Sequence, residues 1–332
     1  MFKFERHPDN PIVTAGTYPW RKCVVFNPAV ILDDDGMFYM LDRAVPQLEP
    51  FYSSFGLLKS RDGVHFKLVG KKPVWSPDML GFPYGSVQDP RLVKIDGIFY
   101  LVYVLRRYAW NLYPTGLGAP RNSQQKDKIP AGDLNASRSG IAISKDMKNW
   151  THREWIGPID LDDRDNVLFP EKIDGRYAIL RRPLNFIGKK YGTKVPSMWL
   201  SYSKDLKSWT KPELLAVPEE DWEVMKIGAS APPVKTKHGW LTSYHGVDKT
   251  NAYYVGFMLL DLKNPMKILA RSKKPLMEPE AYYERFGLVI PNTIFVTANV
   301  EVDGILHLYY GCCDTAIALA TAPVEDILNE LR

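Results

Sequence analysis

Short apolar runs separated by tight polar turns recur five times along the chain. Four of the five units begin with a segment that contains a proline, and the fifth begins with "VTANV"; each continues with an apolar run, a turn and a second run that contains aromatic residues. Asp-Gly or His-Gly between two such runs is a strong hairpin signal. The turns end on glycines that recur at intervals of roughly 60 to 80 residues, namely Gly36, Gly97, Gly175, Gly239 and Gly304.

A third apolar run follows each hairpin, and in three units it leads to a Ser-Lys/Arg-Asp turn and then an aromatic residue. Asp146 and Asp205 belong to these turns, where we expect them to cap the local backbone. A third strand and a short fourth strand would complete a four-stranded antiparallel blade. Five all-β units of about 65 residues predict a five-bladed β-propeller, because radial repetition leaves few exposed sheet edges.

The predicted propeller occupies residues 1–332 as a single domain with a short C-terminal helix, since "PVEDILNELR" has helical spacing. The second unit is lengthened by an insertion over roughly 107–137 that is rich in Gly, Pro, Asn and Lys. Long loops of this kind in compact domains are usually functional or disordered.

Composition and charge narrow the function. The net charge of +5 is mild and no basic block is present, so nucleic acid is not an expected partner. The three cysteines have no zinc-type spacing, and no metal is expected. No apolar run approaches the length of a membrane span, so no membrane partner is expected. We therefore expect a cytoplasmic protein, or a periplasmic one if a signal peptide has been removed.

In a propeller, the residues that precede each inner strand converge at one mouth of the central channel. The polar residues at these blade starts are therefore candidates for a shared site: Asn27, Asp89, Glu171, Lys226 and the residues around Asn292. The inner hairpin ends contribute a second group, which consists of Arg43, Arg181, Arg182, His245 and Asp314.

Four segments carry a family resemblance over nearly the whole chain. "GSVQDPRLVKIDGIFYLVYV", "VLFPEKIDGRYAILRRP", "KIGASAPPVKTKHGWLTSYHGVD" and "YYGCCDTAIALATA" resemble the mannoside phosphorylases and mannosidases of glycoside hydrolase family 130. Members of that family are five-bladed propellers, which agrees with the independent repeat count. The resemblance implies a β-mannoside phosphorylase that acts on a mannosyl-glucose, a mannosyl-N-acetylglucosamine or a mannooligosaccharide.

The resemblance also implies a role for each matching residue. Asp89 corresponds to the single catalytic carboxylate, which protonates the leaving oxygen through a substrate hydroxyl. Inorganic phosphate attacks C1 with inversion and yields α-mannose 1-phosphate, so phosphate is a co-substrate and no organic cofactor is implied. Arg182, Lys226 and His245, with Arg164 as a further candidate, match the phosphate-binding positions, and Asn27, Arg43 and Asp314 match positions that hold the mannose.

Several departures keep alternatives open. Gln88 replaces the Glu that is common before the catalytic Asp, and the insertion in the second unit is unusual. An inverting β-mannosidase of the same family would use water and a carboxylate base, for which Glu223 is the candidate. Direct catalysis by Glu171 is a further alternative. A non-catalytic sugar-binding propeller and an arabinan-type hydrolase remain as further hypotheses. The sequence leaves linkage, acceptor sugar and oligomeric state open, with a symmetric homo-oligomer as the common default.

Overall fold

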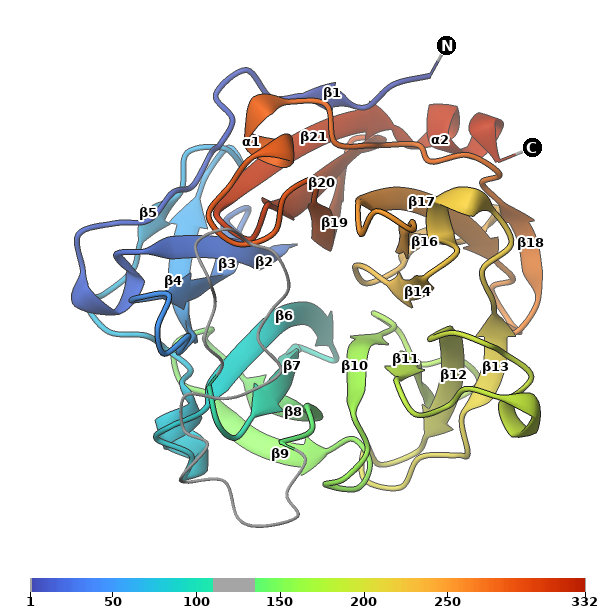
Figure 1. Cartoon of the computed structure of the whole chain (residues 1–332), viewed down its shortest axis with the longest axis horizontal. Coiled ribbons are helices and arrows are strands. Elements are labelled where there is room, and N and C mark those ends of the chain that lie inside the picture. The colour runs from blue at the N-terminus through green and yellow to red at the C-terminus, as the bar shows by residue number, and fades with distance from the viewer. Residues whose placement is uncertain (1, 110–134, 332) are drawn as a thin grey trace.

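Five antiparallel sheets stand radially around a central axis in the computed structural model, which describes residues 2–109 and 135–331 (Figure 1). The arrangement confirms the predicted all-β fold and the five-bladed β-propeller. Most of the predicted insertion at 107–137 lies outside the described residues. In the described part of the chain, no helix is long and apolar enough to cross a membrane.

The first three blades each run outward from the axis in chain order. Blade one consists of β2 (Val24–Leu32), β3 (Phe38–Val45), β4 (Ser54–Ser60) and β5 (Lys67–Leu68). Blade two consists of β6 (Ser86–Ile95), β7 (Ile98–Arg106), β8 (Arg138–Ser144) and β9 (Thr151–Trp155). Blade three consists of β10 (Asp163–Leu168), β11 (Tyr177–Pro183), β12 (Met198–Ser203) and β13 (Glu213–Ala216).

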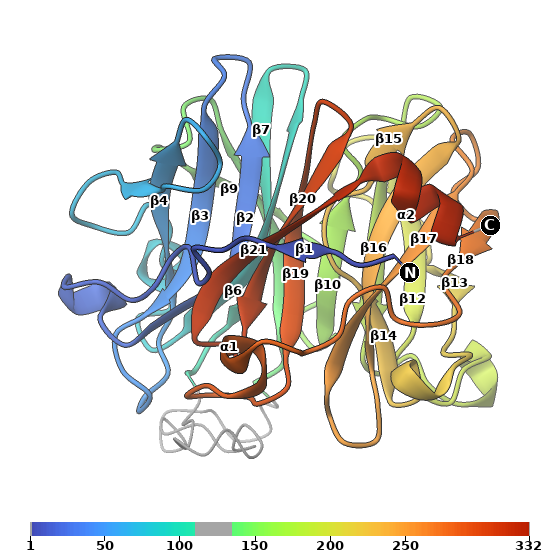
Figure 2. The same cartoon turned by 90° about the horizontal axis from the view of Figure 1, so that it is seen from above.

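The last two blades depart from this scheme. In blade four the inner strand is split into two segments that both pair with β16, and its strands are β14 (Lys226–Ala229), β15 (Val234–Thr236), β16 (Gly239–Val247), β17 (Tyr253–Leu260) and β18 (Ile268–Arg271). Blade five has the order β19 (Ile294–Val302), β20 (Ile305–Cys312), β21 (Ala316–Pro323) and β1 (Glu5–Arg6). Its fourth strand therefore comes from the beginning of the chain, and β1 lies along β21 at the outer edge (Figure 2).

The described helices are short. The α-helices are α1 (Tyr282–Arg285) and α2 (Val324–Glu330). The 3₁₀ segments are η1 (Pro19–Arg21), η2 (Pro77–Leu80), η4 (Lys189–Tyr191) and η5 (Asp221–Glu223). Helix α2 occupies the predicted C-terminal helical segment and buries Ile327 and Leu328 against blade five.

The predicted turns have the geometry that their residues favour. Asp96, Asp174 and Asp303 adopt φ of 51°, 50° and 49°, and the following glycines are also at positive φ. Two successive left-handed residues match the twist of the flanking strands, which explains the Asp-Gly pairs. In the Ser-Lys-Asp turns, Asp146 and Asp205 each accept hydrogen bonds from backbone N–H groups two and three residues on, so their predicted capping role is confirmed.

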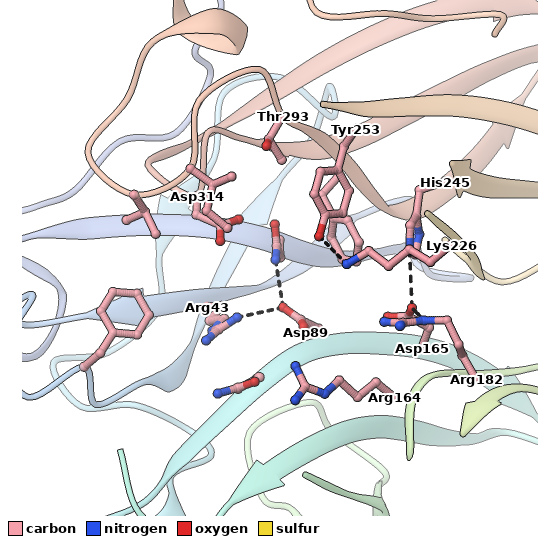
Figure 3. A pocket seen from close by; sticks show the side chains of 16 residues that line it. Arg43, Asp89, Arg164, Asp165, Arg182, Lys226, His245, Tyr253, Thr293 and Asp314 are labelled. Atoms are coloured by element: carbon pink, nitrogen blue, oxygen red, sulfur yellow. Dashed lines mark hydrogen bonds and ion pairs between the residues drawn. The ribbon is translucent and has the colours of Figure 1, made fainter. Parts of the chain in front are cut away.

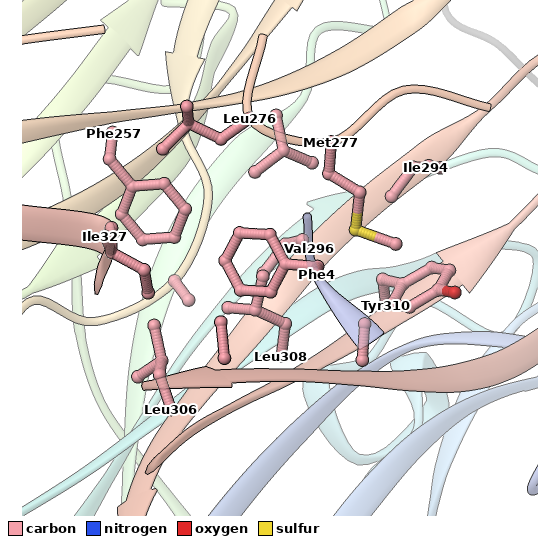
Figure 4. Packing of buried hydrophobic residues seen from close by; sticks show 14 of the residues in the cluster. Phe4, Phe257, Leu276, Met277, Ile294, Val296, Leu306, Leu308, Tyr310 and Ile327 are labelled. Atoms are coloured by element: carbon pink, nitrogen blue, oxygen red, sulfur yellow. The ribbon is translucent and has the colours of Figure 1, made fainter. Parts of the chain in front are cut away.

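The apolar cores lie between neighbouring blades. Between blades four and five, Phe4 stacks on Phe257 with ring centroids 5.9 Å apart, and Leu308 and Ile327 belong to the same cluster (Figure 4). Burying a phenylalanine side chain stabilises a fold by about 2–3 kcal/mol. Residues before and in β1 thus contribute both backbone pairing and packing to the last blade.

An ion pair fixes β1 in place. Arg6 Nε and Nη2 donate to the two carboxylate oxygens of Glu284 at 2.8 and 2.9 Å. Glu284 is fully buried and also accepts from the Tyr310 hydroxyl at 2.7 Å and from the backbone N–H groups of Glu280 and Ala281. Losing the guanidinium would leave a buried carboxylate without its charge partner, which is costly.

We expect Arg6→Ala to lower the free energy of unfolding by about 2 kcal/mol, because Arg6 is itself partly exposed and the full cost of a buried pair does not apply. Thermal and urea unfolding would measure the change. Lys3→Ala is the matched control: Lys3 pairs with Glu280 with 68% of its side chain exposed, and should cost less than about 0.5 kcal/mol. Equal effects of the two substitutions would contradict the structural role of the Arg6–Glu284 pair.

Candidate active site

A pocket of about 160 Å³ opens at one end of the central channel, where the inner strands begin (Figure 3). The eight residues to which the resemblance assigns a role all contribute to its lining: Asn27, Arg43, Asp89, Arg164, Arg182, Lys226, His245 and Asp314. They come from all five blades. The structure therefore brings together the predicted set, while the role of each residue remains a prediction.

A bulge in the inner strand turns one polar side chain of each of the first three blades into the pocket. Asn27, Asp89 and Asp165 lie at φ of 44°, 49° and 50°, and each sits where the register of its strand pair shifts. Left-handed backbone is tolerated best by Asn, Asp and Gly, and a bulge re-aims the side chain it carries. The same local distortion thus delivers an amide and two carboxylates to one place.

At one side of the pocket, Asp89 is held by its neighbours. Asn27 Nδ2 and Arg43 Nη1 both donate to Asp89 Oδ1, at 2.7 and 2.9 Å. The Arg43 guanidinium also lies 4.5 Å from the centroid of the Phe26 ring and 5.7 Å from that of the Phe51 ring. Both of these hydrogen bonds end on Oδ1 of Asp89, and neither engages its other carboxylate oxygen.

At the opposite side, cationic and neutral nitrogen donors surround a second carboxylate (Figure 3). Arg182 Nε donates to Asp165 Oδ2, and His245 Nε2 lies 3.4 Å from the same oxygen. Lys226 Nζ donates to the Tyr253 hydroxyl at 2.6 Å. Arg164 pairs with Asp162 through Nε at 2.9 Å and also lines the pocket.

This cluster depends on close backbone approach at Gly228. A Cβ at Gly228 would lie 2.4 Å from Asp165 Oδ2, 2.6 Å from His245 Cε1 and 2.8 Å from Arg182 Nε. Any larger residue would force the three side chains apart. The glycine of the "KIGAS" segment is therefore a packing requirement of the cation cluster.

The environment of the pocket shifts the pKa values of its titratable groups in different directions. Burial lowers the pKa of His245 to about 3, with Arg182 and Lys226 acting in the same direction and Asp165 opposing them, so the imidazole is neutral. Burial is the largest single influence on Asp165 and favours its protonated form, but the surrounding charges, with Arg182 first among them, together outweigh burial and lower the pKa of Asp165. Burial raises the pKa of Asp314 to about 7; Arg43 opposes that shift, and the Asp89 charge adds to it.

Several buried polar atoms of the pocket have no hydrogen-bond partner among the described residues. Within the described residues, Asn27 Oδ1 and both ring nitrogens of His245 make no hydrogen bond. Leaving such a group unsatisfied costs roughly 1–3 kcal/mol. Buried atoms of this kind are suited to a polar ligand with hydroxyl or phosphoryl groups.

Beneath the pocket, the buried Arg91 joins four blades. Its Nη1 donates to the Asp89 carbonyl at 2.8 Å and its Nε donates to the Ser230 carbonyl at 2.7 Å. Its Nη2 lies 3.7 Å from Asp165 Oδ1, and its guanidinium lies over the Phe295 ring. The Arg of the "QDPR" segment therefore supports the site from below.

Three sequence-based expectations are wrong. Glu171 follows β10, is exposed and pairs with Lys235 instead of lining the pocket. The blade-start position predicted for Glu171 is occupied by Asp165, which lies at the bulge. Glu223 is fully buried away from the pocket, where it accepts from the Glu219 and Glu220 N–H groups and from Arg271 Nη2. Arg181 alternates away from Arg182 and pairs with the buried Asp163.

Sequence reasoning missed part of the pocket. Asp165 could have been found by aligning "RDNV" with "QDPR" and "FNPA", because all three place Asn or Asp at the bulge. Tyr253 carries no motif, and only the structure brings it to Lys226. Phe51, Val289 and Ile290, which form an apolar wall, come from segments between strands with no local signal.

The described residues contain no group of three or more His, Cys, Asp or Glu side chains that could hold a metal ion. All three cysteines are unpaired thiols. The pocket places the hydrogen-bonded carboxyl group of Asp89 opposite a cluster of cations, across a space of small-molecule size. Such a cluster suits a phosphate or a similar oxyanion.

Comparisons with known proteins agree with this chemistry. A family model described as beta-1,4-mannooligosaccharide phosphorylase matches residues 5–332. A 1,2-beta-oligomannan phosphorylase from Thermoanaerobacter sp. (strain X514) is 35% identical over 98% of this chain and 99% of its own, and a beta-1,2-mannobiose phosphorylase from the same organism is 34% identical with the same coverage.

A solved structure shares the fold over nearly its full length. The beta-1,2-mannobiose phosphorylase from Listeria innocua, in complex with beta-1,2-mannobiose, superposes with a TM-score of 0.79 at 24% identity, covering 99% of each chain.

The raised pKa of Asp314 has a consequence for stability. The folded state binds a proton at Asp314 up to pH of about 7, whereas the unfolded state releases it near pH 4. Stability attributable to Asp314 is therefore present below pH 4 and is lost as the pH rises to about 7. We expect Asp314→Asn to become progressively more stable relative to the parent over this interval, as measured by urea unfolding in phosphate-free buffers. A difference that is flat with pH would contradict the assignment.

Proposed function

This chain belongs to glycoside hydrolase family 130, and we propose that it is an inverting β-mannoside phosphorylase that releases α-mannose 1-phosphate. The observation that carries the proposal is the position of Asp89 opposite the cluster of Arg182, Lys226 and His245 in one pocket. The relatives named as phosphorylases support the same reaction.

The proposed reaction assigns the cation cluster to inorganic phosphate. Arg182 and Lys226 supply positive charge, and the neutral His245 supplies a ring N–H donor. Arg164 lies at the edge of the same cluster. An oxyanion held in this way is already a nucleophile, so the reaction needs no protein carboxylate to activate it.

Asp89 acts as the acid. The phosphate oxygen forms a bond to C1 of the mannose while the bond from C1 to the glycosidic oxygen breaks. The leaving oxygen takes the proton of Asp89, directly or through a mannose hydroxyl, and the proton carried by hydrogen phosphate later restores the acid. The hydrogen bonds from Asn27 and Arg43 to Oδ1 hold the carboxyl group in position, and Asp314 is proposed to bind mannose hydroxyls.

Hydrolysis is the less favoured alternative. An inverting hydrolase needs a second carboxylate as base, placed to activate water on the far side of the sugar. Glu223 cannot serve, because it is buried among its own backbone N–H groups and Arg271. Asp165 is engaged by Arg182, with 3% of its side chain exposed.

The linkage is proposed to be β-1,2. Both of the Thermoanaerobacter relatives are named for β-1,2-linked substrates, although the family model is described for a β-1,4-linked one. The acceptor is then a second mannose or a mannooligosaccharide. The β-1,4 series, with glucose or N-acetylglucosamine as acceptor, is the comparison that tests this choice.

The direct test is to incubate the protein with β-1,2-mannobiose, β-1,4-mannosyl-glucose and β-1,4-mannosyl-N-acetylglucosamine, each with and without phosphate. We expect α-mannose 1-phosphate to form only when phosphate is present, and fastest from the β-1,2 substrate. Asp89→Asn should lower kcat by about 10²–10⁴-fold with the fold intact. Free mannose that forms equally without phosphate would instead establish hydrolysis, and turnover by Asp89→Asn at the parent rate would remove Asp89 from its role.

A second prediction concerns the phosphate site. Lys226→Ala should raise the KM for phosphate by about 10–100-fold, as expected for loss of one charged hydrogen bond, with a smaller change in the KM for the mannoside. Lys235→Ala is the matched control, because Lys235 is half-exposed and pairs with Glu171 outside the pocket. The assignment fails if the KM for phosphate is the same in both variants.

A further inference from the structure

Three large apolar side chains lie exposed within seven residues at blade five. Tyr282, Phe286 and Leu288 have 78%, 55% and 43% of their surface exposed, and we call them the blade-five shelf. They belong to α1 and the segment that follows it, at one face of the propeller (Figure 2). A cluster of this kind costs solubility and usually marks a binding surface.

The shelf stands on a rigid base. The Tyr282 and Phe286 rings lie against each other with centroids 5.1 Å apart. Between them, the side chain of Glu284 points inward and is fixed by Arg6 and Tyr310. The two rings therefore project from a helix turn whose inner side is tied to the core, and they lose little further freedom when a ligand binds.

The shelf is continuous with the pocket along the chain. Leu288 N donates to Thr315 Oγ1 at 2.8 Å, and a Cβ at Gly287 would lie 2.3 Å from Cys313 Cβ, so this segment packs closely on the turn that carries Asp314. The next two residues, Val289 and Ile290, line the pocket as its apolar wall. One chain segment thus carries both the exposed rings and the apolar wall of the pocket, with the buried Val289 between the exposed Leu288 and the half-buried Ile290.

In the proposed reaction, the acceptor sugar leaves toward the side of the pocket next to the blade-five shelf. Inversion requires phosphate and the leaving oxygen to lie on opposite faces of C1. Arg182 lies on the side of the pocket away from Asp314, and the Lys226 side chain reaches into the space between them (Figure 3). The pocket, at about 160 Å³, is smaller than the roughly 300–1,000 Å³ of sites that enclose drug-sized ligands. Further sugar units must therefore lie outside it.

We propose that the blade-five shelf binds the mannose units of an oligosaccharide that lie beyond the two joined by the cleaved bond. The C–H faces of pyranose rings pack on aromatic rings, which combine a large apolar surface with defined geometry. The proposal rests on the proposed function and extends it: the substrates are oligosaccharides and not disaccharides alone. A second copy of the chain fits the shelf less well. Stable interfaces bury about 800 Å² and 20–30 residues on each partner, whereas the shelf consists of three residues.

The test compares Tyr282→Ala/Phe286→Ala with the parent protein on mannobiose and mannotetraose, in both the β-1,2 and β-1,4 series. The readout is the ratio of kcat/KM for the tetrasaccharide to kcat/KM for the disaccharide, with phosphate saturating. We expect this ratio to fall about tenfold in the double variant, because two ring contacts are lost. Leu269→Ala is the matched control, since Leu269 is 41% exposed on the outer strand β18 and should leave the ratio unchanged.

The other outcomes overturn the inference. An unchanged ratio, or an equal loss on both substrates, would show that the shelf does not select for longer chains. A change in oligomeric state of the double variant, measured by light scattering after gel filtration, would assign the shelf to a subunit contact. If the parent releases no mannose 1-phosphate, the proposed function fails separately, and calorimetric binding of mannotetraose to the parent and the double variant decides the role of the shelf.

Discussion

The site depends on one buried guanidinium. Arg91 donates to the Asp89 carbonyl and the Ser230 carbonyl and lies beside the Asp165 carboxylate, so it joins blades two, four and three at the bottom of the pocket. Burial lowers its pKa from the usual value, but an arginine side chain remains charged in proteins. Since a buried charge is tolerated only where it is paired, these blades must keep their relative positions for the guanidinium to be satisfied.

A second constraint acts at the level of the backbone. Asn27, Asp89 and Asp165 occupy equivalent bulges in successive inner strands, all in the left-handed region. In a regular strand, successive side chains point to the two faces of the sheet. The bulge in each of these strands instead turns one side chain toward the pocket. The repeat thus supplies three equivalent positions: Asn27 donates a hydrogen bond to Asp89, and Asp165 pairs with Arg182 beside His245.

Much of this was predictable from the sequence because repetition and turn chemistry are local signals. The Asp-Gly hairpins, the Ser-Lys-Asp turns and the blade count follow from spacing alone, and the family resemblance placed Asp89 and the cations. The errors arose where local patterns compete: the proline before Glu171 imitates a blade start, while the true equivalent, Asp165, is followed by Asn166. Glu223 was misplaced because its capping of η5 and its pairing with Arg271 depend on contacts far apart in the chain. Neither the Lys226–Tyr253 contact nor the pairing of β1 with β21 has any signature in the residues concerned.

The pairing of β1 with β21 also means that the propeller can close only after the last blade has been synthesised. The chain emerges from its N-terminus, so Glu5 and Arg6 exist long before the strand and the Glu284 carboxylate that receive them. Four blades can assemble in turn beside a growing chain, but the ring cannot close, and Asp314 cannot reach Asp89, until the last blade is made. A chain whose synthesis stops before blade five would therefore lack the closed ring and would be inactive, with its N-terminal segment unpaired. Activity would appear only when the last blade is made and pairs with that segment.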